Sequence, residues 1–265
     1  MDTNEGSVSN KRGVLQLLWG MTVRPRNTLQ YLNEKGGRLW WLPALLAVLM
    51  AVLPIVVGSP IVAEQAREVF LANQEQMAEQ GMVFSEEQLA QMENIATSPL
   101  INLLFPIVAS VLGLVIAWLI WSGLLYLAGM VFGGRSTFGD LFRMTVWAWW
   151  PFVWRGLFQT VYILVSGQLI LHPGLSGLVS GAPSASEMVT FSPGLGQLAL
   201  IAFLAQVDLF LFWRLALLAV GVIVVMRLSW RKAALIVLGI WLLLTALGLI
   251  PTLIGGMFAR MMAGG

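Results

Sequence analysis

Long uninterrupted apolar segments constrain this chain more than any other feature of its sequence. Residues 101–132 and 233–259 contain no charged side chain, and each exceeds the roughly 20 residues that a helix needs to cross a bilayer. Hydrophobic residues make up 58% of the chain and charged residues 11%, which is more apolar surface than a soluble domain of this size can bury. The sequence therefore predicts an all-α, polytopic membrane protein.

We expect five transmembrane helices, at residues 39–57, 101–132, 144–171, 198–226 and 233–259. Residues 1–38 are expected to form a cytosolic tail with interfacial helices, and residues 39–265 a single membrane domain. The segment 61–99 is hydrophilic and rich in glutamate, with Gly81 as a helix stop and Ser85 and Gln88 as a capping box. It predicts an extracytoplasmic helical hairpin between spans one and two, whose acidic face is either simply solvated or a docking surface.

The positions of lysine and arginine predict the orientation. Basic side chains lie before span one, after span two and after span four, at Lys11, Arg12, Arg24, Arg26, Lys35, Arg38, Arg135, Arg143, Arg227, Arg231 and Lys232. The segments on the opposite side carry only Arg67 and Arg260. By the positive-inside rule the N-terminus is cytosolic and the C-terminus is extracytoplasmic.

Two charged residues are expected near mid-bilayer, Arg155 in span three and Asp208 in span four. An unpaired charge there costs at least about 2.5 kcal/mol, so we predict that they form an ion pair. Gln159 and Gln206 are candidate hydrogen-bond partners, and Arg214 either shares Asp208 or reaches backbone groups. This intramembrane polar cluster either clamps spans three and four together or lines a water-filled path or a lipid headgroup pocket. The clamp is favoured, because an ion path usually needs more acidic groups than one aspartate.

The corner between spans two and three carries a short polar motif. Gly133, Gly134 and Arg135 form a turn, and Thr137 with Asp140 matches the pattern of a helix cap. The chain is expected to turn on the glycine pair, cap a new helix and re-enter the bilayer. Four tryptophans would then anchor the helix at headgroup depth, namely Trp147, Trp149, Trp150 and Trp154.

This corner, followed by an apolar helix that reaches Pro151, resembles the central motif of the Yip family of five-span membrane proteins. The segments Trp213–Leu215 and Leu228–Ala233 resemble that family's fourth-to-fifth-span corner, and Arg24–Arg26 fits the start of its first span. The resemblance implies a non-enzymatic protein that works through partners. In eukaryotes the family is linked to small GTPases and vesicle traffic, and in bacteria to membrane exporters. The short cytosolic tail departs from the eukaryotic pattern.

We therefore expect a bacterial inner-membrane adaptor or accessory subunit, associated with an envelope transporter, another membrane complex or copies of itself. The alternative is a small transporter or channel that uses Arg155, Asp208 and Arg214. No enzymatic activity, cofactor, metal or nucleic acid is expected. The chain has no cysteine, its one histidine (His172) has no second ligand nearby, and its basic residues are dispersed.

Overall fold

The computed structural model describes residues 13–35, 39–82, 84–179 and 194–263, and the regular structure in these ranges is helical. Within them, four helical stretches are long and apolar enough to cross a membrane. They are α3 (Trp41–Glu79), the stretch 86–132 that ends in α5 (Phe105–Phe132), α9 (Leu209–Met226) and α10 (Trp230–Ala263). The chain is thus an all-α, multi-pass membrane protein.

Shorter helices connect or flank these four. They are α1 (Val14–Val23), α2 (Pro25–Lys35), α4 (Glu86–Ala96), α6 (Phe138–Ala148), α7 (Trp150–Ser166) and α8 (Leu195–Leu204). A π-helical turn (Leu100–Leu104) precedes α5, and a 3-10 turn (Ser176–Leu178) follows α7.

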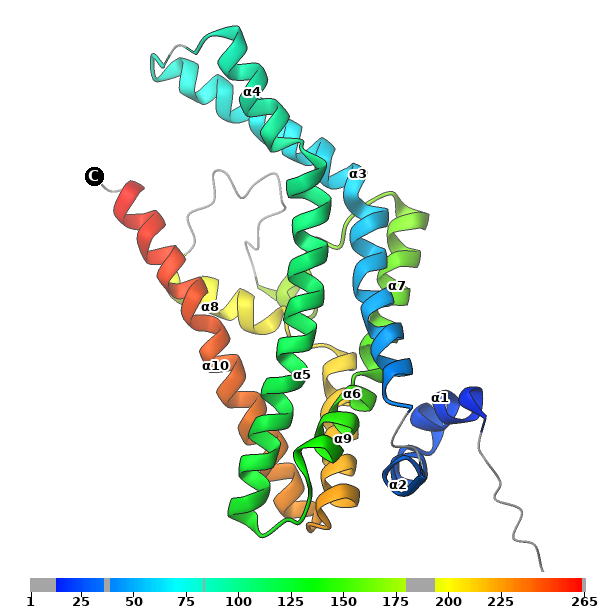
Figure 1. Cartoon of the computed structure of the whole chain (residues 1–265). Coiled ribbons are helices and arrows are strands. Elements are labelled where there is room, and N and C mark those ends of the chain that lie inside the picture. The colour runs from blue at the N-terminus through cyan, green and yellow to red at the C-terminus, as the bar shows by residue number, and fades with distance from the viewer. Residues whose placement is uncertain (1–12, 36–38, 83, 180–193, 264–265) are drawn as a thin grey trace, which may run out of the picture.

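The helices form a bundle with one end marked by α1 and α2 (Figure 1). The connections α5–α6 and α9–α10 lie at this same end, whereas the tip formed by α3 and α4 lies at the other, as does the end of α10. Helices α3 and α7 run side by side, and α10 tilts away from them. Helix α8 lies across the bundle at mid-height, so it does not extend α9 along the membrane normal.

The predicted third and fourth spans are not continuous helices, which corrects the expectation from the sequence. Helix α6 ends at Ala148 and α7 begins at Trp150, because Pro151 has no N–H to continue the hydrogen-bond ladder. Helix α8 ends at Leu204, and Asp208 has an extended backbone before α9. Alone, α7 has 17 residues and α8 has 10, fewer than a full span needs.

Helix α3 is longer than the predicted first span. The sequence predicts its end near residue 57, but α3 continues through Pro54 and Pro60 and reaches Glu79. A proline removes one hydrogen bond from a helix, and neighbouring helices can compensate for that loss in a membrane protein. Phe70 on the far half of α3 is buried, and Arg67 pairs with Glu93 of α4 at 3.1 Å. The second half of α3 therefore packs against α4.

The core lies where α5, α6 and α9 meet. Its fully buried side chains include Leu125, Leu141, Val146, Leu218 and Val222. The tryptophans of this region belong to the same core rather than to the headgroup layer. Trp147, Trp149 and Trp150 are only 2%, 5% and 7% exposed, so the expectation that they anchor the helix in the headgroups is wrong. They face other helices because α6 and α7 are surrounded by α3, α5 and α9.

The N-terminal helices α1 and α2 pack on the bundle through one face. Leu17, Met21 and Leu29 are buried, and the indole Nε1 of Trp150 donates a hydrogen bond to Thr22 Oγ1 at 2.9 Å. The opposite face of α1 exposes Leu15 and Trp19. This arrangement suits helices that lie at a membrane surface with apolar side chains facing the lipid.

Close approach of α3 and α7 depends on Gly156. A Cβ atom at this position would meet the backbone carbonyl of Met50, which belongs to α3 and cannot rotate away as a side chain can. Small residues allow helices in membranes to pack at short distance. A Cβ atom at Gly113 of α5, in contrast, would meet no atom within 4 Å.

We predict that Gly156→Ala lowers the free energy of unfolding by about 1–3 kcal/mol, because the new methyl group forces α3 and α7 apart. Gly113→Ala is the matched control, since it adds the same methyl group in open space. It should leave stability unchanged or raise it slightly, as alanine favours helices. Thermal unfolding of both variants in detergent measures the difference, and equal midpoints would contradict the packing argument.

Candidate functional site

The charged residues of α7 and α9 form an ion pair inside the bundle. Arg155 Nε lies 3.2 Å from Asp208 Oδ2, and the two side chains are 35% and 15% exposed. This is the ion pair that the sequence predicts. The second carboxylate oxygen of Asp208 accepts a hydrogen bond from the backbone N–H of Leu211 at 2.7 Å. Asp208 therefore holds Arg155 and caps α9 at the same time.

The capping role of Asp208 is absent from the sequence prediction, which treats residues 198–226 as one apolar helix. Asp is among the preferred residues at the first position before a helix, because its carboxylate accepts backbone N–H groups that have no partner. An aspartate directly before the apolar run Leu209–Met226 is thus a helix-start signal. The apolar residues on both sides of Asp208 conceal this signal, because together they predict one continuous helix.

The pair lies at the start of α9, with exposed apolar side chains beyond it on α7. The 18 residues of α9 extend about 27 Å below Asp208 at 1.5 Å per residue. On α7, Ser166 lies about 16 Å beyond Arg155 by the same rise, and Leu164 and Val165 near that end are exposed apolar residues. Exposed apolar side chains therefore continue beyond the pair on α7, while the length of α9 alone is close to the roughly 30 Å of a hydrocarbon core.

The two glutamines of the predicted cluster occupy different places. Gln159 is partly buried and lines the same cavities as Arg155. Gln206 is exposed, and its amide donates to the backbone carbonyl of Ala202 at 3.2 Å. Gln206 therefore contributes to its own turn, not to the Arg155–Asp208 pair.

Arg214 does not share Asp208. Its guanidinium carbon lies 3.6 Å from the ring centroid of Trp149 and 4.6 Å from that of Trp121. Arg214 is 7% exposed, and its Nε and Nη2 atoms have no hydrogen-bond partner among the described residues. Aromatic faces attract a cation, by about 2 kcal/mol or more when the contact excludes water. Arg214 is thus held by aromatic rings in place of a carboxylate.

Phe152 contacts both arginines. Its ring centroid lies 5.7 Å from the guanidinium carbon of Arg155 and 5.2 Å from that of Arg214. The ring of Phe152, just after the α6–α7 break, is therefore close to two cations. The predicted cluster is therefore two sites: an ion pair with Asp208, and an aromatic cage around Arg214.

Two cavities adjoin Arg155. The first, which we call the α7–α9 cavity, has a volume of about 870 Å³ and is lined by Arg155, Gln159, Asp208, the outer part of α7, residues 168–174 and the start of α9. The second, the α3–α7 cavity, has about 320 Å³ and is lined by α3, α5 and α7. Arg155 and Gln159 line both. Arg155 therefore borders open space on either side of α7, whereas Asp208 borders only the α7–α9 cavity.

The corner between α5 and α6 adopts the predicted cap. Thr137 Oγ1 accepts the backbone N–H of Asp140 at 3.2 Å, and Asp140 pairs with Arg143 at 2.8 Å. Gly133 has a left-handed backbone with φ of 79°, which suits a glycine after a helix. A Cβ at Gly134 would come within 3.1 Å of Met226, so the second glycine allows close packing against α9.

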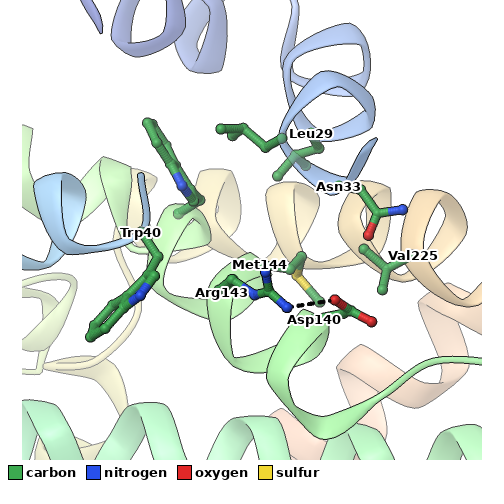
Figure 2. Close-up of a pocket in the computed structure, with 9 residues that line it drawn as sticks. Leu29, Asn33, Trp40, Asp140, Arg143, Met144 and Val225 are labelled. Atoms are coloured by element: carbon green, nitrogen blue, oxygen red, sulfur yellow. Dashed lines mark hydrogen bonds and ion pairs between the residues drawn. The ribbon is translucent and has the colours of Figure 1, made fainter. Parts of the chain in front are cut away.

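Figure 2 shows the Asp140–Arg143 pair beneath α2, with Asn33, Leu29 and Val225 nearby. The cavity between them has a volume of about 20 Å³, which is room for about one water molecule. Arg135 is exposed beside this packed corner. The motif therefore has a structural role, because it joins the N-terminal helices to the bundle. Its Arg135 side chain remains at the surface.

The Yip1 domain model matches residues 19–251 of this sequence, which cover most of the chain. The chain belongs to the Yip1 domain family. It matches no curated protein and no solved structure. In this Yip1 domain protein, the matched region includes the α5–α6 corner, Arg155, Asp208 and Arg214. Among the described residues, no group of three His, Cys, Asp or Glu side chains is placed to hold a metal ion.

We predict that the charge swap Arg155→Asp with Asp208→Arg is more stable than either single substitution. Each single variant puts two like charges together at membrane depth, whereas the swap restores an ion pair. The swap should remain about 1 kcal/mol less stable than the original chain, because arginine at position 208 cannot cap α9. Thermal unfolding in detergent measures all four forms. A swap no more stable than either single variant would show that the pair does not hold α7 to α9.

Proposed function

We propose that this protein is a non-enzymatic adaptor or accessory subunit of a bacterial inner-membrane complex, and that it crosses the membrane five times. Membership of the Yip1 domain family and the apolar helices support a role within the membrane. In this proposal the partner is an envelope transporter, another membrane protein or a second copy of the chain.

Five crossings are compatible with the broken helices. Helices α6 and α7 together cover residues 138–166, which is enough to form a third crossing, and α9 supplies the fourth. Helices α1 and α2 lie at one end of the bundle, and the end of α10 lies at the other (Figure 1). This arrangement supports an odd number of crossings. The basic corners at the α1–α2 end support a cytosolic N-terminus.

The observation that carries the adaptor proposal is the arm formed by the second half of α3 and by α4, residues 64–96. It extends beyond the bundle (Figure 1), and α4 has no buried residue. Apolar side chains are exposed on the arm, at Leu71, Met82, Met92 and Ile95, with 38–60% of each accessible. Exposed apolar residues on an arm that lies outside the bundle are candidates for contact with a protein partner.

The transporter alternative receives less support from the geometry. It needs Arg155, Asp208 and Arg214 to act as one group, but Arg214 is enclosed by Trp121, Trp149 and Phe152 and makes no ion pair with Asp208 in the described part of the chain. A path for ions would also need further acidic groups beside Asp208. The ion pair fits a clamp between α7 and α9 better.

Cysteine labelling tests the topology, because the chain has no native cysteine. We predict that a membrane-impermeant maleimide labels Gln76→Cys on the arm in intact bacterial cells. Ser229→Cys, at the exposed α9–α10 corner, should react only after the cells are opened. Ala148→Cys is the control for burial, since Ala148 is fully buried. Labelling of Gln76→Cys and Ser229→Cys from the same side would contradict the proposed orientation.

Photo-crosslinking tests partner binding by the arm. We predict that a photoreactive residue at Ile95 or Leu71 forms a discrete adduct with one protein in cells. Leu242 of α10 is a matched control, because it is similarly exposed and apolar but belongs to a proposed lipid-facing helix surface. If the arm positions give no adduct and the chain purifies from mild detergent as a solitary monomer, the adaptor proposal is wrong.

A further inference from the structure

The α7–α9 cavity combines a polar floor with apolar walls. Arg155, Gln159 and Asp208 lie on one part of its surface, and Gln168 and His172 add two more polar side chains. The remaining lining includes Phe158, Tyr162, Leu209 and Phe210, of which Phe158 and Leu209 are 58% and 75% exposed. A volume of about 870 Å³ is in the range of ligand-binding sites in proteins.

Arg155 and Asp208 differ in the ligand groups that they can still bind. Asp208 uses one carboxylate oxygen for Arg155 and the other for the N–H of Leu211. Arg155 uses Nε for Asp208, and its terminal nitrogens make no hydrogen bond to any other described residue. A guanidinium has five N–H donors, so Arg155 keeps donors for a ligand, whereas each carboxylate oxygen of Asp208 already has one cationic or N–H partner. The cavity thus favours an acceptor group over a cation.

We propose that the α7–α9 cavity binds the phosphate-bearing headgroup of a membrane lipid, with the phosphate on the terminal nitrogens of Arg155. The planar fork of a guanidinium matches two oxygens of a phosphate. The apolar walls then lie along the glycerol and the first part of the acyl chains, and Gln159, Gln168 and His172 contact the polar part of the headgroup. The ligand is an amphiphile because the polar floor and the apolar walls belong to one cavity.

The position of the cavity selects a lipid over free phosphate. Arg155 lies below the exposed apolar side chains Leu164 and Val165 of the same helix, so a ligand reaches it from the bilayer with its apolar part in place. A free phosphate ion would have to leave water to reach Arg155, and it has no apolar part to contact the walls of the cavity. This site is separate from the proposed arm of the adaptor, and each can fail without the other.

Native mass spectrometry of the full chain in detergent tests the proposal with three probes: phosphatidylethanolamine, diacylglycerol and inorganic phosphate. The chain should retain phosphatidylethanolamine and not diacylglycerol, which has the same chains without phosphate. Millimolar inorganic phosphate should not displace the phospholipid. Displacement by inorganic phosphate, or equal retention of diacylglycerol, would overturn the assignment of a lipid phosphate site.

The variant for this test is the neutral double substitution Arg155→Gln with Asp208→Asn. It removes both charges together and leaves an asparagine, which still caps α9. Retention of phosphatidylethanolamine should fall about tenfold, as expected for losing a charge-assisted contact to phosphate. The control is Arg143→Gln with Asp140→Asn, which removes the ion pair of the α5–α6 corner and should leave retention unchanged. Equal retention by both double variants overturns the proposal.

A second variant covers the case in which the neutral double variant does not fold. Gln168→Trp adds bulk at an exposed position of the cavity lining and leaves both charges in place. It should lower the retention of phosphatidylethanolamine by occupying the space of the lipid. Unchanged retention by this variant, with an unchanged unfolding temperature, would show that the lipid does not occupy the cavity.

Discussion

The first backbone N–H groups of a helix have no partner within that helix, and the arrangement of α7, α8 and α9 depends on how Asp208 meets that constraint. Its carboxylate caps α9 and pairs with Arg155. The cap provides a partner for the N–H of Leu211 at the point where the chain leaves α8 and turns into α9. The pair in turn holds Arg155 of α7 against the start of α9. One side chain thus fixes both the break in the chain and the packing of two helices.

The second cation is held by a different physical interaction. Arg214 lies between Trp149 and Trp121, and Trp149 is the residue between α6 and α7. The helix break caused by Pro151 therefore also supplies a ring of the aromatic cage. Phe152, one turn away, faces both arginines. An aromatic cage needs no acidic partner, so one aspartate in this region suffices for two arginines, of which Arg214 is buried and Arg155 is 35% exposed.

Sequence reasoning succeeded where the signal was local or where the energy cost was large. The Thr137–Asp140 cap and the Ser85–Gln88 cap need only residues three positions apart, and both are present. The Arg155–Asp208 pair followed from the cost of an unpaired charge. The breaks at Trp149 and after Leu204 were missed, because continuous hydrophobicity concealed them. The burial of Trp147 could not be predicted, since it depends on which helices surround α6.

Pro151, Gly156 and Asp208 together explain why space remains beside the ion pair. Pro151 lies in the first turn of α7, directly after the break from α6, and Gly156 lets α7 approach the backbone of α3. Helix α8 leaves the direction of α9 and crosses the bundle instead (Figure 1). The outer part of α7 therefore has α3 on one side and no continuation of α9 on the other. A cavity at Arg155 is the direct result, because a straight fourth helix would have filled it with side chains.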